Sequence, residues 1–207
     1  MRYVDINQGS QEWLQWRKGG LGGSDAAAIL GLSPFKTRER LLLELSGQVE
    51  PEQANFAMRR GSRLEPIARK LYEEAHGAYM PPACCEHESL SWMRASLDGL
   101  NLAGEILLEI KWPNFEVHSQ ALNGVVPPYY LCQVQHQLVV SGARLGHYWS
   151  CTEHKKFGQE ELTALVVIER DVTLERRLVF ELGRFWHELE DLRYGAKNQQ
   201  GLIHQGR

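Results

Sequence analysis

The pattern of apolar and polar residues changes along the chain, from helical spacing in the first part to short apolar runs in the middle. Ser10 is placed to cap a short helix that ends at the glycine-rich segment Gly19–Gly23. The middle runs are typical of strands, and an amphipathic helix closes the chain. The predicted helices are Ser10–Arg17, Asp25–Leu30, Thr37–Leu45, Ala54–His76, Phe115–Leu122, Pro128–Val140 and Val172–Tyr194, and the predicted strands are Leu90–Leu97, Ile106–Trp112, Leu145–Cys151 and Leu162–Glu169.

This order of elements predicts an α/β protein. Helices precede two strands, further helices, two more strands and a final helix, which favours a mixed central β-sheet flanked by helices. The segment Gly99–Gly104 is expected to join Leu90–Leu97 to Ile106–Trp112 as a hairpin. We expect a single domain over residues 1–195 and a flexible tail over residues 196–207.

Composition and charge narrow the class of protein. The chain is 43% hydrophobic and 24% charged, as is ordinary for a soluble domain. It has neither a run of about 18 apolar residues nor a cationic and apolar leader, so we expect a cytoplasmic protein without a membrane partner. The net charge of −3 does not announce a nucleic-acid partner, but residues 11–70 hold ten Lys or Arg against seven Asp or Glu. The four cysteines show no CxxC spacing and are expected to be buried free thiols.

One short segment carries most of the candidate chemistry. Side chains alternate along a strand, so Glu109 and Lys111 share a face, about 6 to 7 Å apart at their Cα atoms, while Ile110 points the other way. If the hairpin returns Asp98 to Glu109, two carboxylates and an ammonium meet at one sheet edge. Hard oxygen donors of this kind favour Mg²⁺ or Mn²⁺. The alternative is a solvated strand face, but charges within a mostly apolar strand are rare unless they are paired or coordinated.

The residues in and around this segment resemble a known family. Asp98 followed by Glu109-Ile110-Lys111 resembles the PD-(D/E)xK nuclease motif, with Leu97 in place of the proline. The surroundings resemble the exonuclease of phage lambda and the YqaJ-type viral recombinases. The supporting segments, in chain order, are Glu12-Trp13-Leu14 with Arg17, Gly23-Ser24-Asp25, Arg60-Gly61 with Glu65, Ser96-Leu97-Asp98, Tyr130-Leu131-Cys132-Gln133-Val134-Gln135 and Val166-Val167-Ile168-Glu169-Arg170-Asp171. The resemblance implies a restriction-endonuclease-like core.

The resemblance also implies roles for the charged residues. Asp98, Glu109 and the Ile110 carbonyl would hold two Mg²⁺ ions, for which Mn²⁺ would substitute, with help from Glu65. Lys111 would act on the attacking water. Taken alone, Glu65 reads as a solvated helical glutamate.

Two glutamines lie on an otherwise apolar predicted helix. Because residues at i and i+2 do not face one partner, at most one of Gln133 and Gln135 is expected at the active site. The resemblance assigns Gln133 to the catalytic site, and Gln135 is expected to make a structural hydrogen bond.

A second candidate site lies near the N-terminus. A glycine loop and a serine at the start of a helix suit a phosphate, although spacing alone favours a simple turn with an N-cap. In the family, an arginine and a serine at this spacing hold the 5′-phosphate of the degraded strand, which implies that role for Arg17 and Ser24. The resemblance further implies that Ser96 and Leu97 contact DNA.

The resemblance predicts a metal-dependent 5′-to-3′ exonuclease on linear double-stranded DNA with 5′-phosphorylated ends. Its product would be a 3′ single-stranded overhang for phage-type recombination. The same family implies a homotrimeric ring, a phage single-strand annealing protein as partner, and a phage or prophage origin in a bacterial cytoplasm. Two alternatives stay open: a structure- or sequence-specific endonuclease of the same fold, and a non-catalytic module that binds DNA ends.

Overall fold

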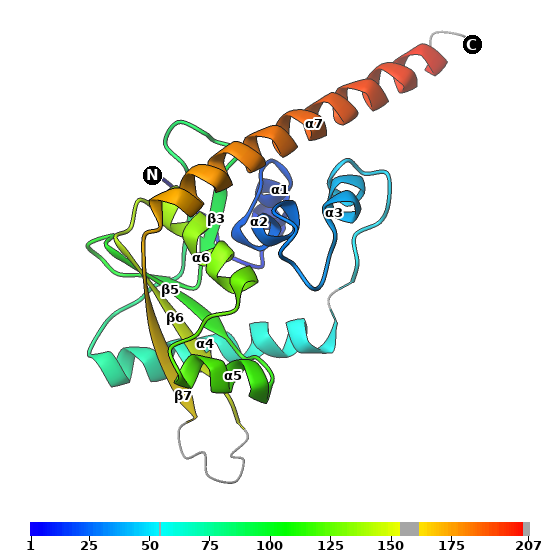
Figure 1. The fold of residues 1–207 in the computed structure, drawn as a ribbon. Coiled ribbons are helices and arrows are strands. Elements are labelled where there is room, and N and C mark those ends of the chain that lie inside the picture. Colours follow the sequence, from blue (N-terminus) through cyan, green and yellow to red (C-terminus); the bar gives the residue numbers. More distant parts are fainter. Residues whose placement is uncertain (54, 154–161, 205–207) are drawn as a thin grey trace.

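The strands of the protein form two sheets that meet at Asp98. A computed structural model describes residues 1–53, 55–153 and 162–204, with side chains up to residue 195 (Figure 1). The first sheet is antiparallel, in the order β1 (Arg2–Val4), β2 (Ala83–Glu86) and β3 (Arg94–Leu97). The second is ordered β4 (Gly99–Leu100), β5 (Ile106–Lys111), β6 (Leu145–Cys151) and β7 (Thr163–Glu169). Among the described strands of this sheet, β5 and β6 run parallel and the other pairs are antiparallel, so the predicted mixed sheet is confirmed.

Helices cover both faces of the second sheet. The helices of the described residues are α1 (Gln11–Lys18), α2 (Gly23–Ile29), α3 (Arg38–Leu45), α4 (Phe56–His76), α5 (Phe115–Leu122), α6 (Pro128–Ser141) and α7 (Val172–His204). Ala68 and Tyr72 of α4 pack against one face of β5 and β6. Val134 and Leu138 of α6 belong to the larger core on the other face. This burial on both faces explains the nearly continuous apolar run of β5.

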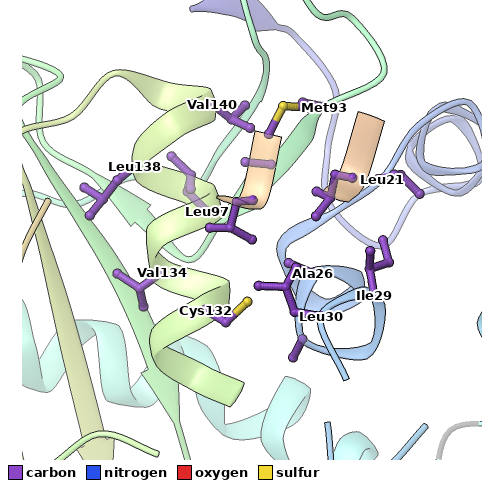
Figure 2. Packing of buried hydrophobic residues seen from close by; sticks show 14 of the residues in the cluster. Leu21, Ala26, Ile29, Leu30, Met93, Leu97, Cys132, Val134, Leu138 and Val140 are labelled. Atoms are coloured by element: carbon purple, nitrogen blue, oxygen red, sulfur yellow. The ribbon is translucent and has the colours of Figure 1, made fainter. Parts of the chain in front are cut away.

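The larger core joins α6 to the N-terminal helices. Figure 1 shows α6 between the four-stranded sheet and α2. Figure 2 shows side chains of α2, α6 and β3 pointing toward one another, among them Ala26, Cys132 and Leu97. Because α2 lies directly on α6, residues at the start of α2 come close to residues that α6 points at β5.

Caps define most of the helix ends. The side chains of Ser10, Asn55 and Asn114 accept hydrogen bonds from backbone N–H groups in the first turns of α1, α4 and α5. Gly77 and Gly142 end α4 and α6 in the left-handed conformation, which costs glycine no strain. Every predicted helix is present, although Ala54, the first residue of one predicted range, lies outside the described residues.

The strand predictions need three corrections. The sequence analysis missed β1 and β2, because β1 has three residues and β2 is built from Ala, Cys, Cys and Glu, which are not strong strand formers. Leu90–Leu97 is a strand only over β3, since its first residues form a turn. The predicted hairpin is wrong: β3 pairs with β2, and it is β4 that pairs with β5.

The last helix is longer than predicted. It continues past Tyr194 to His204, because no proline interrupts this stretch and the glycines at 195 and 201 each cost a helix only about 1 kcal/mol. Figure 1 shows its C-terminal half extending beyond the body of the protein. The flexibility of residues 196–207 stays a prediction, and residues 205–207 lie outside the described part.

The four cysteines are buried and free, as expected. Within the described part of the chain, no helix combines the length and the hydropathy needed to cross a bilayer.

Candidate active site

The switch between the two sheets brings Asp98 to the predicted strand. Asp98 lies between β3 and β4, and its Oδ2 accepts a hydrogen bond from the Ile110 N–H at 2.7 Å. Gly99 makes this close approach of β4 to β5 possible, because a Cβ there would lie 2.9 Å from Met80 Cβ and 3.1 Å from Leu108 Cβ. Asp98 therefore reaches the site through a backbone crossing and not through a hairpin.

Glu109 and Lys111 share one face of β5, as predicted. Lys111 Nζ lies 2.5 Å from Glu109 Oε1, and Ile110 packs in the core on the opposite face. Glu109 is 1% exposed, whereas Lys111 is partly exposed. A buried carboxylate needs hydrogen-bond donors, and the ammonium supplies one of them.

Two amides of α6 supply the others. Gln133 Nε2 donates to Glu109 Oε1 and Gln137 Nε2 donates to Glu109 Oε2, each at 2.6 Å. Gln133 therefore lies at the site, where the resemblance put it. Gln137 was missed by the sequence analysis, although its i+4 spacing from Gln133 places both amides on one helix face. Gln135 faces elsewhere: it bonds Glu169 O and the Asp171 N–H, which confirms the expected structural hydrogen bond.

Lys111 is held as an ammonium. Burial alone would lower the pKa of Lys111, but the carboxylates of Glu109 and Asp98 outweigh it and raise the pKa above its ordinary value. Its Nζ also lies 4.9 Å from the centre of the Tyr130 ring, which favours a cation. In this arrangement Lys111 can donate hydrogen bonds and stabilise negative charge.

The site carries more carboxylate than the lysine can neutralise. Burial, followed by the charges of Glu109 and Glu65, raises the pKa of Asp98 well above its usual value. Burial also raises the pKa of Glu65, and Glu109 adds to this. Arg69 offsets part of this negative charge, since it pairs with Glu65 Oε1 and donates to the Asp98 carbonyl at 2.6 Å. Mutual repulsion of this kind is relieved by a cation.

The donor set suits a hard divalent cation in its chemistry. Asp98 and Glu109 offer carboxylate oxygens within one hydrogen-bonded unit, and Glu65 is close enough to perturb Asp98. Across the described residues, no three His, Cys, Asp or Glu side chains are gathered into a ready-made ligand cluster. A metal at this site would be held first by the carboxylates of Asp98, between β3 and β4, and Glu109 of β5.

The second candidate site also comes together. The exposed side chains of Arg17 and Ser24 meet, with Arg17 Nη2 donating to Ser24 Oγ at 3.3 Å. The Arg17 guanidinium lies 4.7 Å from the centre of the Trp13 ring, and Trp13 Nε1 donates to Ser96 Oγ at 2.8 Å. Since Ser96 is two residues before Asp98, this chain of contacts links the Arg17 and Ser24 pair to the carboxylates.

Leu97 requires a correction. Its side chain is 0% exposed and packs in the larger core, where Figure 2 shows it among apolar neighbours. A side chain so buried has no face open to DNA. The strand alternation explains the error, because Leu97 lies between the two partly exposed residues Ser96 and Asp98.

This mixed sheet, with helices on both faces and the acidic residues and lysine at the end of β5, is a restriction-endonuclease-like fold. The chain belongs to the family of YqaJ-like viral recombinase domains, whose sequence profile matches residues 12–144.

Similar proteins agree with this assignment. Protein YqaJ of Bacillus subtilis is 32% identical over 182 residues, which cover 86% of this chain and 55% of YqaJ. Protein D345L of African swine fever virus is 26% identical over 164 residues, 65% of this chain and 46% of D345L. The chain thus spans about half the length of these curated relatives.

Solved structures of the same fold include exonucleases. The alkaline exonuclease LHK-Exo from Laribacter hongkongensis superposes with a TM-score of 0.79 at 28% identity, over 93% of this chain and 100% of that one. A phage-related exonuclease from Haemophilus somnus shares the fold, with a TM-score of 0.64 at 12% identity over 87% of this chain and 96% of that one.

Proposed function

We propose that this protein is a metal-dependent exonuclease that digests one strand of linear double-stranded DNA in the 5′-to-3′ direction. The observation that carries the proposal is the unit of Asp98, Glu109 and Lys111 at the end of β5, in a fold shared with a solved alkaline exonuclease. Family membership supports a role in recombination, for which the 3′ single strand left behind would be the useful product.

Each residue of the site has a part in phosphodiester hydrolysis. Asp98, Glu109 and the Ile110 carbonyl, with Glu65, would hold Mg²⁺, two ions in full occupancy, with Mn²⁺ as a substitute. When bound, the metal polarises the scissile phosphate and lowers the pKa of a coordinated water. Lys111 donates to oxygen atoms on which negative charge develops, a role its retained proton allows.

The Arg17 and Ser24 pair would hold the terminal 5′-phosphate. Both side chains are exposed, and a guanidinium is well suited to phosphate oxygens. The contacts through Trp13 and Ser96 tie this pair to Asp98, so an anchored end would fix the register of the strand at the carboxylates. Of the two residues expected to reach DNA directly before Asp98, only Ser96 keeps that role, because Leu97 is buried.

The wider setting is proposed from the family. Three copies would form a ring around DNA, so that the basic N-terminal thirds of the chains face one channel. A phage single-strand annealing protein would take up the product, in the cytoplasm of a bacterial host of a phage or prophage. The membership in a viral recombinase family supports this setting.

Plasmid substrates test the reaction class. We expect EcoRI-linearised plasmid to be degraded in Mg²⁺ or Mn²⁺ and to survive in EDTA, while supercoiled plasmid persists in all three. Rapid nicking of the supercoiled form would show an endonuclease instead. Intact linear DNA in both metals, with retained binding to its ends, would show a non-catalytic end-binding module.

A further inference from the structure

Gln137 makes a contact that nothing in the motif pattern assigns. Its side chain is 2% exposed, and its Nε2 donates to Glu109 Oε2 at 2.6 Å. The other oxygen of Glu109 receives Gln133 and Lys111. Gln137 is thus the sole side-chain donor to Oε2 among the hydrogen bonds of the described residues.

The stability of the folded protein alone does not explain a glutamine at position 137. Its Oε1 is buried and has no hydrogen-bond partner among the described residues, so only the nitrogen of the amide makes a hydrogen bond there. A buried polar group left without a partner disfavours the folded state, whereas an apolar side chain of similar size would leave no such atom. The compensating contact is the one with Glu109.

Gly23 restricts the same amides from the side of α2. A Cβ at Gly23 would lie 3.1 Å from Gln133 Cγ and 3.4 Å from Gln137 Cγ. The start of α2 therefore rests on both side chains and limits the rotamers open to them. The Glu109 carboxylate is in this way fixed at both oxygens by side chains that are themselves packed.

We propose that Gln137 is a positioning residue that orients Glu109 for a divalent cation and sets the affinity of the site for that cation. The inference rests on the proposed function, because it takes Glu109 as a metal ligand. Partners of this kind fix the orientation of a ligating carboxylate, and their removal typically weakens metal binding by about 10-fold to 100-fold. In this role Gln137 would act through its contact with Glu109 and would touch neither the metal nor the substrate.

Direct binding of Mn²⁺ tests the proposal on the full chain. Isothermal titration calorimetry and the electron paramagnetic resonance signal of free Mn²⁺ give the dissociation constant for wild type and for Gln137→Met, which removes the donor at similar volume. We expect the dissociation constant of the variant to be about 10-fold to 100-fold higher than that of wild type. Cleavage by the variant should return toward the wild-type rate when Mn²⁺ is raised by the same factor.

Gln135→Met is the matched control. Gln135 is a buried amide of the same helix, but it bonds Glu169 and Asp171 and not the site. This control should lower the melting temperature and leave Mn²⁺ affinity unchanged. If Gln137→Met does not fold by circular dichroism, Gln137→Asn keeps an amide that is one methylene too short to reach Oε2 and replaces it in the test.

The outcomes separate this inference from the proposed function. If wild type cleaves linear DNA and Gln137→Met binds Mn²⁺ as tightly as wild type, the inference alone is overturned. Equal losses of affinity in the Gln137 and Gln135 variants would overturn it as well, since they would reflect packing. If wild type neither cleaves linear DNA nor binds Mn²⁺, the proposed function is contradicted, and so is the inference that rests on it.

Discussion

Lys111 shows how a single residue is defined by its neighbours. Taken without the apolar strand around it, a lysine two positions after a glutamate is an ordinary surface pair. In the structure it lies against a fully buried carboxylate and near the ring of Tyr130, and its pKa is raised by Glu109 and Asp98 against the effect of burial. These contacts make Lys111 a fixed ammonium next to the proposed metal ligands.

Replacing Lys111 by methionine should abolish cleavage and spare binding. Loss of one donor to a developing negative charge typically costs about 100-fold to 1,000-fold in rate, so we expect at least a 100-fold fall in nucleotide release from linear duplex. Fluorescence anisotropy in Ca²⁺ should show unchanged affinity for DNA ends. Lys70→Met is the control, because Lys70 is highly exposed and its one ion pair among the described residues is with Glu74 across a helix turn. A Lys111 variant that cleaves within a few-fold of wild type would contradict the assignment.

His136 predicts how stability depends on pH. It is 0% exposed, neither ring nitrogen has a partner among the described residues, and burial, with a smaller effect from His87, lowers its pKa to about 4. Between its ordinary pKa of 6.5 and about 4, the unfolded chain binds a proton here that the folded chain does not. The free energy of unfolding should therefore fall by about 1.4 kcal/mol per pH unit as pH drops below 6.5.

His136→Met should remove this part of the pH dependence. Urea unfolding at pH 7.5 and at pH 5.0 gives the difference in the free energy of unfolding for each protein, and wild type should lose more of it than the variant. Equal losses in the two proteins would show that His136 is protonated in the folded state.

At the scale of elements, α6 serves two purposes that its sequence only partly reveals. Gln133 and Gln137 face β5, while Gln135 fixes the junction of β7 and α7. The helix itself was predictable from length and its flanking proline and glycine. The i and i+2 spacing correctly separated Gln133 from Gln135. The i and i+4 spacing of Gln133 and Gln137 also places both amides on one face of the helix, although most residues around Gln137 are apolar.

Long-range pairing accounts for what the sequence did not predict. The helices and the strands β5, β6 and β7 followed from local periodicity, as did the shared face of Glu109 and Lys111. The strands β1 and β2 were missed because they are short and depend on partners about 80 residues away. That pairing also decides that Asp98 reaches Ile110 by a change of sheet, which no local pattern encodes.

Gly23→Ala should disturb the contact between α2 and α6. The added Cβ would lie 3.1 Å from Gln133 Cγ and 3.2 Å from the Gln133 carbonyl oxygen, which forces a shift at the site. Overpacking of this kind typically costs about 1 to 3 kcal/mol, and we expect a lower melting temperature together with reduced cleavage. In the control Gly183→Ala, the new Cβ meets no atom closer than 3.9 Å, so stability should hold or rise. Unchanged cleavage in Gly23→Ala would show that the two glutamines tolerate the shift.

At the scale of the whole molecule, the charge distribution favours assembly. A single chain with a net charge of −3 is a weak partner for DNA, yet residues 11–70 are locally basic. Several copies that turn this third of the chain toward one channel would add their weak attractions. The number of copies comes from the family resemblance, which implies a trimer, with a mass by sedimentation equilibrium of three times the 23.7 kDa chain. A monomer at micromolar concentration would contradict the ring.

The direction of digestion tests the carboxylate site and the Arg17 and Ser24 pair in one measurement. A linear duplex carries a label at the 3′ end of one strand and either a phosphate or a hydroxyl at each 5′ end, and its digestion in Mg²⁺ is followed over time for wild type and Arg17→Met. We predict that wild type removes nucleotides from the 5′ ends, leaves the 3′ label on long fragments at early times, and acts faster on the phosphorylated duplex. Arg17→Met should lose most of the advantage given by the phosphate. Early release of the 3′ label as a mononucleotide, or no digestion of either duplex, would contradict a 5′-to-3′ exonuclease.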